Sequence, residues 1–233
     1  MSRQDLLFLP GLLCDGRLWR DQAEGIADLA TPAIADLTLD DTVAGMARRV
    51  LAAAPDRFAL AALSMGGYVA FEILRQAPAR VTRLALFDTS ARLDSTARSR
   101  QRRVSLASAE KGRFIGVGRG LMPRLIHARH LGGPLEAVIR GMADRVGADA
   151  FARQQQAILT RPDSQPGLPA IRVPTLVAAG DSDQMTPVAE AEAIRDAIPG
   201  ARLHLFADCG HLPPLEQPAE TTALLRTWLQ AKA

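Results

Sequence analysis

Short apolar runs alternate with longer stretches of helical period along most of the chain. Six segments are predicted to be strands, namely residues 6–9, 33–36, 58–63, 81–87, 173–179 and 202–206. Apolar runs of this length, bounded by Gly, Pro or polar residues, are typical of buried parallel strands. With helices between them, they predict a three-layer α/β fold built on a minimal, mostly parallel sheet of about six strands.

The stretches between the predicted strands carry apolar residues on one helical face. The clearest example spaces its apolar positions at i, i+3, i+4, i+7 and i+8, at Val43, Met46, Ala47, Val50 and Leu51. Such a stripe predicts an amphipathic helix packed on the sheet. Further helices are expected over residues 18–29, 66–76 and 188–198 and at the C-terminus, and Thr31-Pro32 is expected to precede the second strand.

The alternation stops in the middle of the chain. Residues 94–161 show no convincing strand, and their polar, arginine-rich helical stretches are interrupted at Gly112, Gly116, Pro123, 132–134 and Gly147. We therefore predict one core domain made of residues 1–92 and 166–233, with residues 93–165 inserted as a helical cap.

Composition fits a single globular domain. The 233 residues are 48% hydrophobic and 23% charged, enough apolar material for a sizeable core. Asp5 precedes a short N-terminal apolar run that ends at Pro10, so we expect neither a targeting segment nor a membrane span. Cys14 and Cys209 are too few for a disulfide framework or a structural zinc site, and we expect a cytoplasmic location.

The basic residues are concentrated in one part of the chain. The net charge is +3, but residues 91–165 hold 14 Lys and Arg against 6 Asp and Glu. Such a segment could attract anions, or it could simply be a solvated helical surface. Aromatic residues make up 4% of the chain, too few for the stacking platforms of nucleic-acid-binding proteins. The sequence thus leaves open an anionic small-molecule substrate and does not favour nucleic acid.

Candidate chemistry lies directly after the predicted strands, where ligands bind in open α/β sheets. The third strand is followed by Ser64, Met65, Gly66 and Gly67, with Ala62 two residues before the serine. Small neighbours let a strand turn sharply into a helix and expose a serine oxygen, although the motif alone also fits a helix-capping serine. Ser64 is the candidate nucleophile.

Three other strand ends carry groups that could assist Ser64. The turn after the first strand, Pro10-Gly11-Leu12, could aim the Leu12 backbone N–H at the same edge, where it would form an oxyanion hole with the Met65 N–H. After the fifth strand, Asp181 and Asp183 are both candidates to orient a histidine. His211 follows the sixth strand and is the one histidine of four at such a position.

Taken together, the motifs resemble the α/β-hydrolase superfamily, whose order along the chain is Ser, Asp, His. The matching segments are 10–12, 62–67, 180–187 with Gly180, Asp183 and Pro187, and 210–211. The resemblance implies Ser64 as nucleophile, His211 as general base and acid, Asp183 as orienting acid, and Leu12 and Met65 as oxyanion donors. It also implies a helical cap, and no metal or other cofactor.

The sequence departs from the family pattern at several points. Pro10 stands where the family often has histidine, and Ala62 replaces a glycine. Because the first predicted strand begins near residue 6, we expect no counterpart of the family's usual N-terminal pair of strands. Asp88, after the fourth strand, is an alternative acid because some members place theirs there. Around residues 87–92 the chain is similar to the branch of 3-oxoadipate enol-lactonase-like hydrolases.

These features predict a serine hydrolase that cleaves a small carboxylic ester, lactone or thioester through an acyl-enzyme. A carbon–carbon bond hydrolase or lyase-type enzyme acting on a carboxylated substrate through the same residues remains an alternative. So does a non-catalytic ligand receptor on the same fold.

Overall fold

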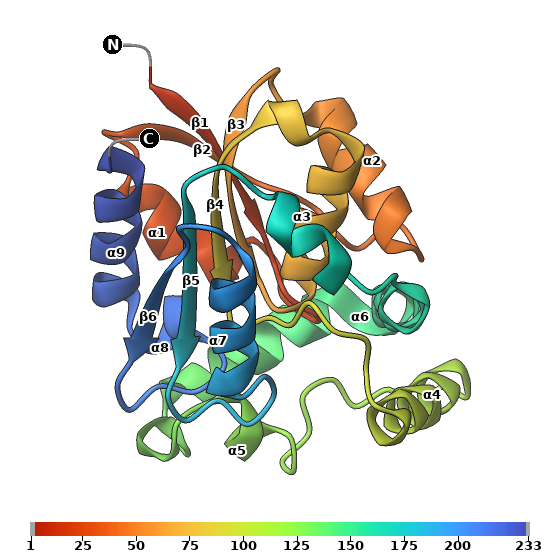
Figure 1. Cartoon of the computed structure of the whole chain (residues 1–233). Helices are drawn as coiled ribbons and strands as arrows, with labels where there is room; N and C mark the ends of the chain where they lie inside the picture. The colour runs from red at the N-terminus through yellow and green to blue at the C-terminus, as the bar shows by residue number, and fades with distance from the viewer. Residues whose placement is uncertain (1–2, 232–233) are drawn as a thin grey trace.

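One sheet of six parallel strands forms the centre of the computed structural model, which describes residues 3–231 (Figure 1). The strands are β1 (Gln4–Leu9), β2 (Ala30–Ile34), β3 (Phe58–Leu63), β4 (Val81–Phe87), β5 (Thr175–Gly180) and β6 (Arg202–Phe206). Their order in the sheet is β2-β1-β3-β4-β5-β6, and every neighbouring pair is parallel. The predicted α/β fold is confirmed.

The chain reverses its direction of travel across the sheet between β1 and β3. From β1 it moves outward to β2 and then returns to place β3 on the other side of β1. The loops after β1 and β3 therefore diverge at a topological switch point, the usual ligand site in such sheets. The register pairs Leu9 with Ala62, so the turn at Gly11 and the turn at Ser64 begin at the same level.

Helices cover both faces of the sheet. They are α1 (Arg20–Gly25), α2 (Val43–Ala53), α3 (Met65–Gln76), α7 (Val188–Ala197), α8 (Pro213–Glu216) and α9 (Pro218–Gln230), with short 3-10 turns η1 (Gly16–Trp19) and η2 (Pro78–Arg80). Figure 1 shows α1 and α9 on one face and α2, α3 and α7 on the other. Successive β1 side chains alternate between these two cores, with Leu6 and Phe8 in one and Leu7 and Leu9 in the other.

The expected break at Pro32 is wrong. β2 begins at Ala30, so Pro32 lies inside the strand and pairs with Leu6 of β1. The strand has a neighbour on one side only, because it lies at the end of the sheet order. Proline lacks an N–H and is tolerated at such an edge.

Residues 88–174, all of which the structure describes, contain no strand. They form α4 (Thr96–Glu110), α5 (Met122–Leu125) and α6 (Pro134–Thr160), with 3-10 turns η3 (Ala128–His130) and η4 (Gln165–Ala170). We call residues 93–165 the helical segment. Gly147 interrupts α6 with φ 75° and ψ 176°, at one of the predicted breaks. No helix within residues 3–231 is long and apolar enough to cross a membrane.

The helical segment is tied to the loops at the carboxyl ends of the strands. The buried amide of Gln154 in α6 accepts a hydrogen bond from the Leu13 N–H and donates one to the Leu37 carbonyl. Leu125 of α5 accepts the backbone N–H of His211 at 2.9 Å. In Figure 1, α5 and the start of α6 lie beyond the strand ends of β5 and β6. The segment thus meets the edge where the candidate residues gather.

Candidate active site

Ser64 occupies a strained turn between β3 and α3. Its φ of 54° and ψ of −114° lie in a region that residues with a side chain rarely adopt, at a cost of about 1–3 kcal/mol. The surroundings hold this backbone in place. The Ser64 N–H donates to the Phe87 carbonyl at 2.9 Å, and the Ser64 carbonyl accepts from the Gly67 N–H at 2.9 Å and the Thr89 hydroxyl at 2.7 Å. The turn therefore presents the Ser64 hydroxyl in a fixed direction.

The glycines after Ser64 allow the close approach that this turn needs. A Cβ atom on Gly66 would lie 2.4 Å from the Leu9 carbonyl oxygen, and one on Gly67 would lie 2.3 Å from the Thr89 hydroxyl. Both distances are shorter than any van der Waals contact. Glycine at both positions lets α3 start directly against β1 and the loop after β4.

The structure brings His211 and Asp183 to Ser64. The Nε2 atom of His211 is 2.9 Å from the Ser64 hydroxyl, and its Nδ1 atom is 2.7 Å from Oδ2 of Asp183. The side chains of His211 and Asp183 are buried, whereas Ser64 is partly exposed. A continuous hydrogen-bonded chain from acid to base to hydroxyl is the arrangement that activates a serine nucleophile.

Asp183 is held as an ionised acceptor. Its Oδ1 accepts the backbone N–H groups of Met185 and Thr186, and its Oδ2 accepts the Thr186 hydroxyl and the His211 ring. Burial raises the pKa of this carboxyl, but the charge of His211 and these hydrogen bonds outweigh burial and leave the pKa below its ordinary value. A carboxylate at Nδ1 favours the tautomer that leaves Nε2 free to take the Ser64 proton.

Asp181, the other candidate after β5, lies elsewhere. It is exposed, and its carboxylate accepts the backbone N–H groups of Asp208 and Cys209 and the hydroxyl of Ser182. Burial raises the pKa of this carboxyl, but these hydrogen bonds together outweigh burial and leave the pKa below its ordinary value. Asp181 thus holds the turn after β6 and does not contact His211.

Asp88 lies beside Asp183 and His211 but has different surroundings from Asp183. The residue is 1% exposed, its Oδ1 accepts the Gly180 N–H at 2.9 Å, and its Oδ2 is buried with no partner in the described chain. Burial and the negative charge of Asp183 raise the pKa of Asp88 well above 3.8. We infer that Asp88 is a neutral acid when Asp183 is ionised.

An Asp88→Asn variant should gain stability relative to the wild type as the pH rises. Folding raises the pKa of Asp88, so the folded chain keeps a proton that the unfolded chain releases above about 3.8. Between about pH 3.8 and the raised pKa of folded Asp88, the free energy of unfolding of the wild type therefore falls as the pH rises, by up to about 1.4 kcal/mol per pH unit. The variant is spared this loss because Asn does not titrate. Asn also tolerates the φ of 45° at this position.

Urea unfolding of both proteins at pH 5 and pH 8 measures this effect. The free energy of unfolding of the variant, minus that of the wild type, should be larger at pH 8. An equal difference at both values would show that Asp88 does not retain its proton on folding.

Asp88, Asp183 and His211 form the one group in the described chain whose spacing resembles a metal site, with ligand atoms within 4.8 Å of one another. Both nitrogens of His211 already face Ser64 and Asp183, and Asp183 already accepts four hydrogen bonds. The arrangement fits a proton-transfer chain better than a set of metal ligands.

The turn after β1 lies against Ser64. A Cβ atom on Gly11 would be 3.4 Å from Cβ of Ser64, and the Cys14 N–H donates to the Gly11 carbonyl to close the turn. Leu13 adopts a φ of 60°, and Gln154 accepts its N–H. This geometry fits Leu12, between Gly11 and Leu13, as an oxyanion donor opposite the N–H of Met65 at the start of α3.

The two cysteines are buried thiols. Burial raises the pKa of Cys14 to about 12 and, together with the charge of Glu216, raises the pKa of Cys209 further. A thiolate is the reactive form of cysteine, so neither side chain is suited to act as a nucleophile at neutral pH.

Many arginines of the helical segment have structural partners. Arg98, Arg102 and Arg161 all pair with Asp94, and Arg140 pairs with Glu136. Arg145 pairs with Asp15 of the core. Part of the excess of basic residues is therefore explained by ion pairs that hold the segment together and join it to the core. These ion pairs give no specific support to the idea that the arginines bind a substrate carboxylate.

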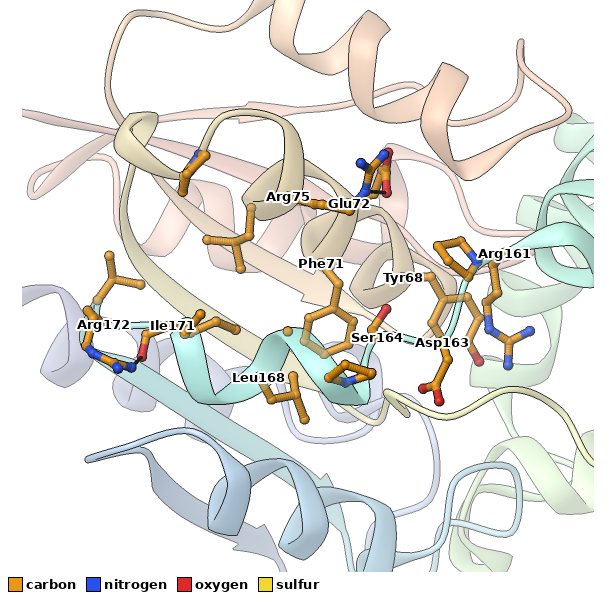
Figure 2. A pocket seen from close by; sticks show the side chains of 17 residues that line it. Tyr68, Phe71, Glu72, Arg75, Arg161, Asp163, Ser164, Leu168, Ile171 and Arg172 are labelled. Atoms are coloured by element: carbon orange, nitrogen blue, oxygen red, sulfur yellow. Dashed lines mark hydrogen bonds and ion pairs between the residues drawn. The ribbon is translucent and has the colours of Figure 1, made fainter.

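A separate hollow of about 580 Å³ lies between α3 and residues 161–173 (Figure 2). Its walls include the rings of Tyr68 and Phe71 and the side chain of Leu168, and the guanidinium of Arg161 lies 4.2 Å from the centre of the Tyr68 ring. Ser64, Asp183 and His211 do not line it. This hollow is distinct from the candidate active site.

Three supporting residues were not identified from the sequence. Thr186 donates to Asp183, Gln154 fixes the turn after β1, and Glu216 accepts backbone N–H groups around His211. Thr186 and Glu216 lie three and five residues after Asp183 and His211, and Glu216 follows the apolar run 212–215. An acid in such a run is a signal for a buried, hydrogen-bonded carboxylate.

The chain is similar to esterases over its full length. It is 26% identical to the pimeloyl-[acyl-carrier protein] methyl ester esterase of Aromatoleum aromaticum, with 97% of this chain and 98% of that protein covered. A thermophilic esterase from Thermogutta terrifontis, solved with malate bound, is 29% identical with a TM-score of 0.87, covering 98% of this chain and 90% of that one.

The fold also matches more distant enzymes. The enol-lactonase of Burkholderia xenovorans LB400 has a TM-score of 0.89 at 22% identity, with 99% of this chain and 93% of that chain covered. At this identity the likeness concerns the fold alone. Residues 6–224 match the model of the alpha/beta hydrolase family, which is nearly the whole chain. The chain therefore belongs to the alpha/beta hydrolase family and is an enzyme of that family.

Proposed function

We propose that this enzyme is a serine hydrolase that cleaves a small carboxylic ester, lactone or thioester through an acyl-enzyme. The observation that carries the proposal is the hydrogen-bonded chain from Asp183 through His211 to the hydroxyl of Ser64. The strained turn at Ser64 supports it, because strain of this kind persists where the surroundings enforce a functional geometry. The two esterases at 26% and 29% identity support the choice of bond.

In the first half of the reaction, the Ser64 Oγ attacks the substrate carbonyl carbon while Nε2 of His211 takes the hydroxyl proton. The carbonyl oxygen becomes an oxyanion, which the N–H groups of Leu12 and Met65 would stabilise. The bond to the leaving alcohol or thiol then breaks, and the leaving group takes the proton from His211. The acyl group stays on Ser64.

In the second half, a water molecule attacks the acyl-enzyme and gives its proton to His211. The bond between the acyl carbon and Ser64 Oγ breaks, and Oγ takes the proton back from His211, releasing the carboxylic acid. Asp183 remains ionised throughout and stabilises the imidazolium that forms at each step. We propose that the helical segment acts as a cap over this site and shapes the substrate pocket.

Labelling with a fluorophosphonate tests the proposal, because this probe reacts with activated serine hydroxyls. We expect one probe per wild-type chain, located at Ser64 by peptide mass analysis, and no labelling of Ser64→Ala. Ser182→Ala is the matched control, since Ser182 is an exposed serine after β5. A folded wild-type protein that takes up no probe, or takes it up elsewhere, contradicts the proposal.

A further inference from the structure

Glu216 is a buried carboxylate on the loop that carries the general base. It ends the short helix α8 and is 6% exposed. Its oxygens accept the Gly210 N–H at 3.1 Å and the Leu212 N–H at 3.1 Å, which are the two backbone amides on either side of His211. The carboxylate therefore fixes the backbone at both neighbours of the catalytic histidine.

The same carboxylate also binds the helical segment. The His127 N–H, which follows α5, donates to Oε2 of Glu216 at 2.7 Å. A second hydrogen bond has its donor on the His211 loop and its acceptor on the helical segment: the His211 N–H donates to the Leu125 carbonyl at 2.9 Å. Glu216 thus stands between the His211 loop and residues 125–127 and contacts both.

The two backbones touch at Gly210. A Cβ atom there would lie 2.8 Å from the His127 nitrogen and 2.8 Å from the Ile126 backbone, which leaves no room for a side chain. Residues 125–127 therefore lie directly on the His211 loop. The hydrogen bonds of Glu216 join surfaces that are already in contact.

The charge of Glu216 is balanced by N–H dipoles. No ion pair within residues 3–231 includes this carboxylate, while three backbone N–H groups point at it. Hydrogen bonds to an ionised acceptor are about twice as strong as neutral ones, and a buried carboxylate without them is costly. The three amides are therefore held in a narrow range of positions.

We propose that Glu216 is a positioning residue that fastens the His211 loop to residues 125–127, so that the general base is correctly placed only while this part of the helical segment covers the sheet end. The inference rests on the proposed role of His211. It assigns to the helical segment a part in assembling the catalytic residues, in addition to covering the substrate.

Glu216→Gln removes the charge and replaces one acceptor oxygen by an amide group that cannot accept an N–H. We expect kcat for a p-nitrophenyl ester to fall about 100-fold with KM changed less than twofold, because a displacement of about 1 Å at the base costs about that much. Amide hydrogen exchange at His127, Gly210 and Leu212 should become faster together. Glu220→Gln, at a half-exposed acid that pairs with His204, is the matched control and should keep wild-type values.

A second variant keeps the test informative if Glu216→Gln does not fold. His127→Pro removes the N–H from the helical segment and puts a ring carbon in its place, at a φ of −61° that proline adopts, after Ile126 in extended conformation. We expect the same fall in kcat, since Oε2 of Glu216 must then move away.

Wild-type kcat and wild-type amide exchange in folded Glu216→Gln would overturn the proposal. A loss of kcat in Glu216→Gln with full activity in His127→Pro would overturn the coupling to the helical segment. The proposed function fails separately, through a wild type that neither turns over esters nor labels at Ser64, and the amide exchange would still report on Glu216.

Discussion

Ser64→Ala should lower kcat for ester hydrolysis by about 10⁶-fold while leaving KM and the melting temperature close to wild type. Alanine removes the only atom proposed to form the acyl bond, and no other hydroxyl shares the hydrogen bond to Nε2 of His211 in the described chain. In a serine protease with the same arrangement of groups, loss of the nucleophile costs about that factor. The effect is the largest that we expect from any single substitution.

The rate should be measured with a chromogenic ester, together with circular dichroism to verify folding. A Ser64→Ala, His211→Ala double variant should be no slower than Ser64→Ala alone, because the two side chains act as one unit. Turnover by folded Ser64→Ala within tenfold of wild type would refute Ser64 as nucleophile. A double variant that is much slower than either single one would assign His211 a role independent of the serine.

The sheet was predictable because each strand carries its own signal. Three of the six strands, β3, β4 and β6, have the expected bounds, since a run such as residues 58–63 is apolar at every position and ends at a small or polar residue. Parallel strands then bring their carboxyl ends to one edge, which explains how residues as distant as Ser64 and His211 could be placed together. β2 was misplaced because the sequence does not show that this strand lies at the edge, where proline is tolerated.

The helical segment was less predictable for a physical reason. Its first helix, α4, is polar on most sides, and Ala109 is the one buried residue of that helix. Glycine still predicted one interruption correctly, because the backbone of α6 is non-helical at Gly147. However, local periodicity says nothing about which loops such a segment touches, and the contacts that matter here join residues 125–127 and Gln154 to distant loops.

Some residues of the candidate site could be predicted from the sequence, and others depend on contacts between distant loops. Ser64 and His211 were predicted because chemistry and position at a strand end coincide, and Asp183 was preferred to Asp181 through the family resemblance. The choice between Asp181 and Asp183 depends on the shape of the turn after β5, and only the structure shows that Asp183 contacts the ring of His211. The supporting carboxyls Asp88 and Glu216 differ in their hydrogen-bond partners, which the sequence does not show: Asp88 has an unpartnered oxygen, whereas Glu216 accepts three N–H groups.

Asp183→Asn should lower kcat by up to about 10⁴-fold with little change in KM. Asparagine keeps the shape but replaces the carboxylate at Nδ1 of His211 by an amide, which favours the wrong ring tautomer and no longer stabilises the imidazolium. We expect Asp88 to limit this loss of kcat, because it is a second carboxyl group close to His211. A carboxyl oxygen of Asp88 lies within 4.8 Å of a carboxylate oxygen of Asp183 and of a ring nitrogen of His211, and the charge of Asp183 is one of the two main causes of the raised pKa of Asp88.

Removing the charge of Asp183 therefore lowers the pKa of Asp88 in the variant, although burial still raises it. As the pH rises, Asp88 should ionise beside His211 and restore part of the activity, so kcat of Asp183→Asn should increase with pH relative to wild type. Asp88→Asn should remain within about threefold of wild type, whereas the double variant should be slower than Asp183→Asn and lose that increase. If Asp88→Asn alone were inactive and Asp183→Asn fully active, Asp88 would be the orienting acid and the assignment of Asp183 would be wrong.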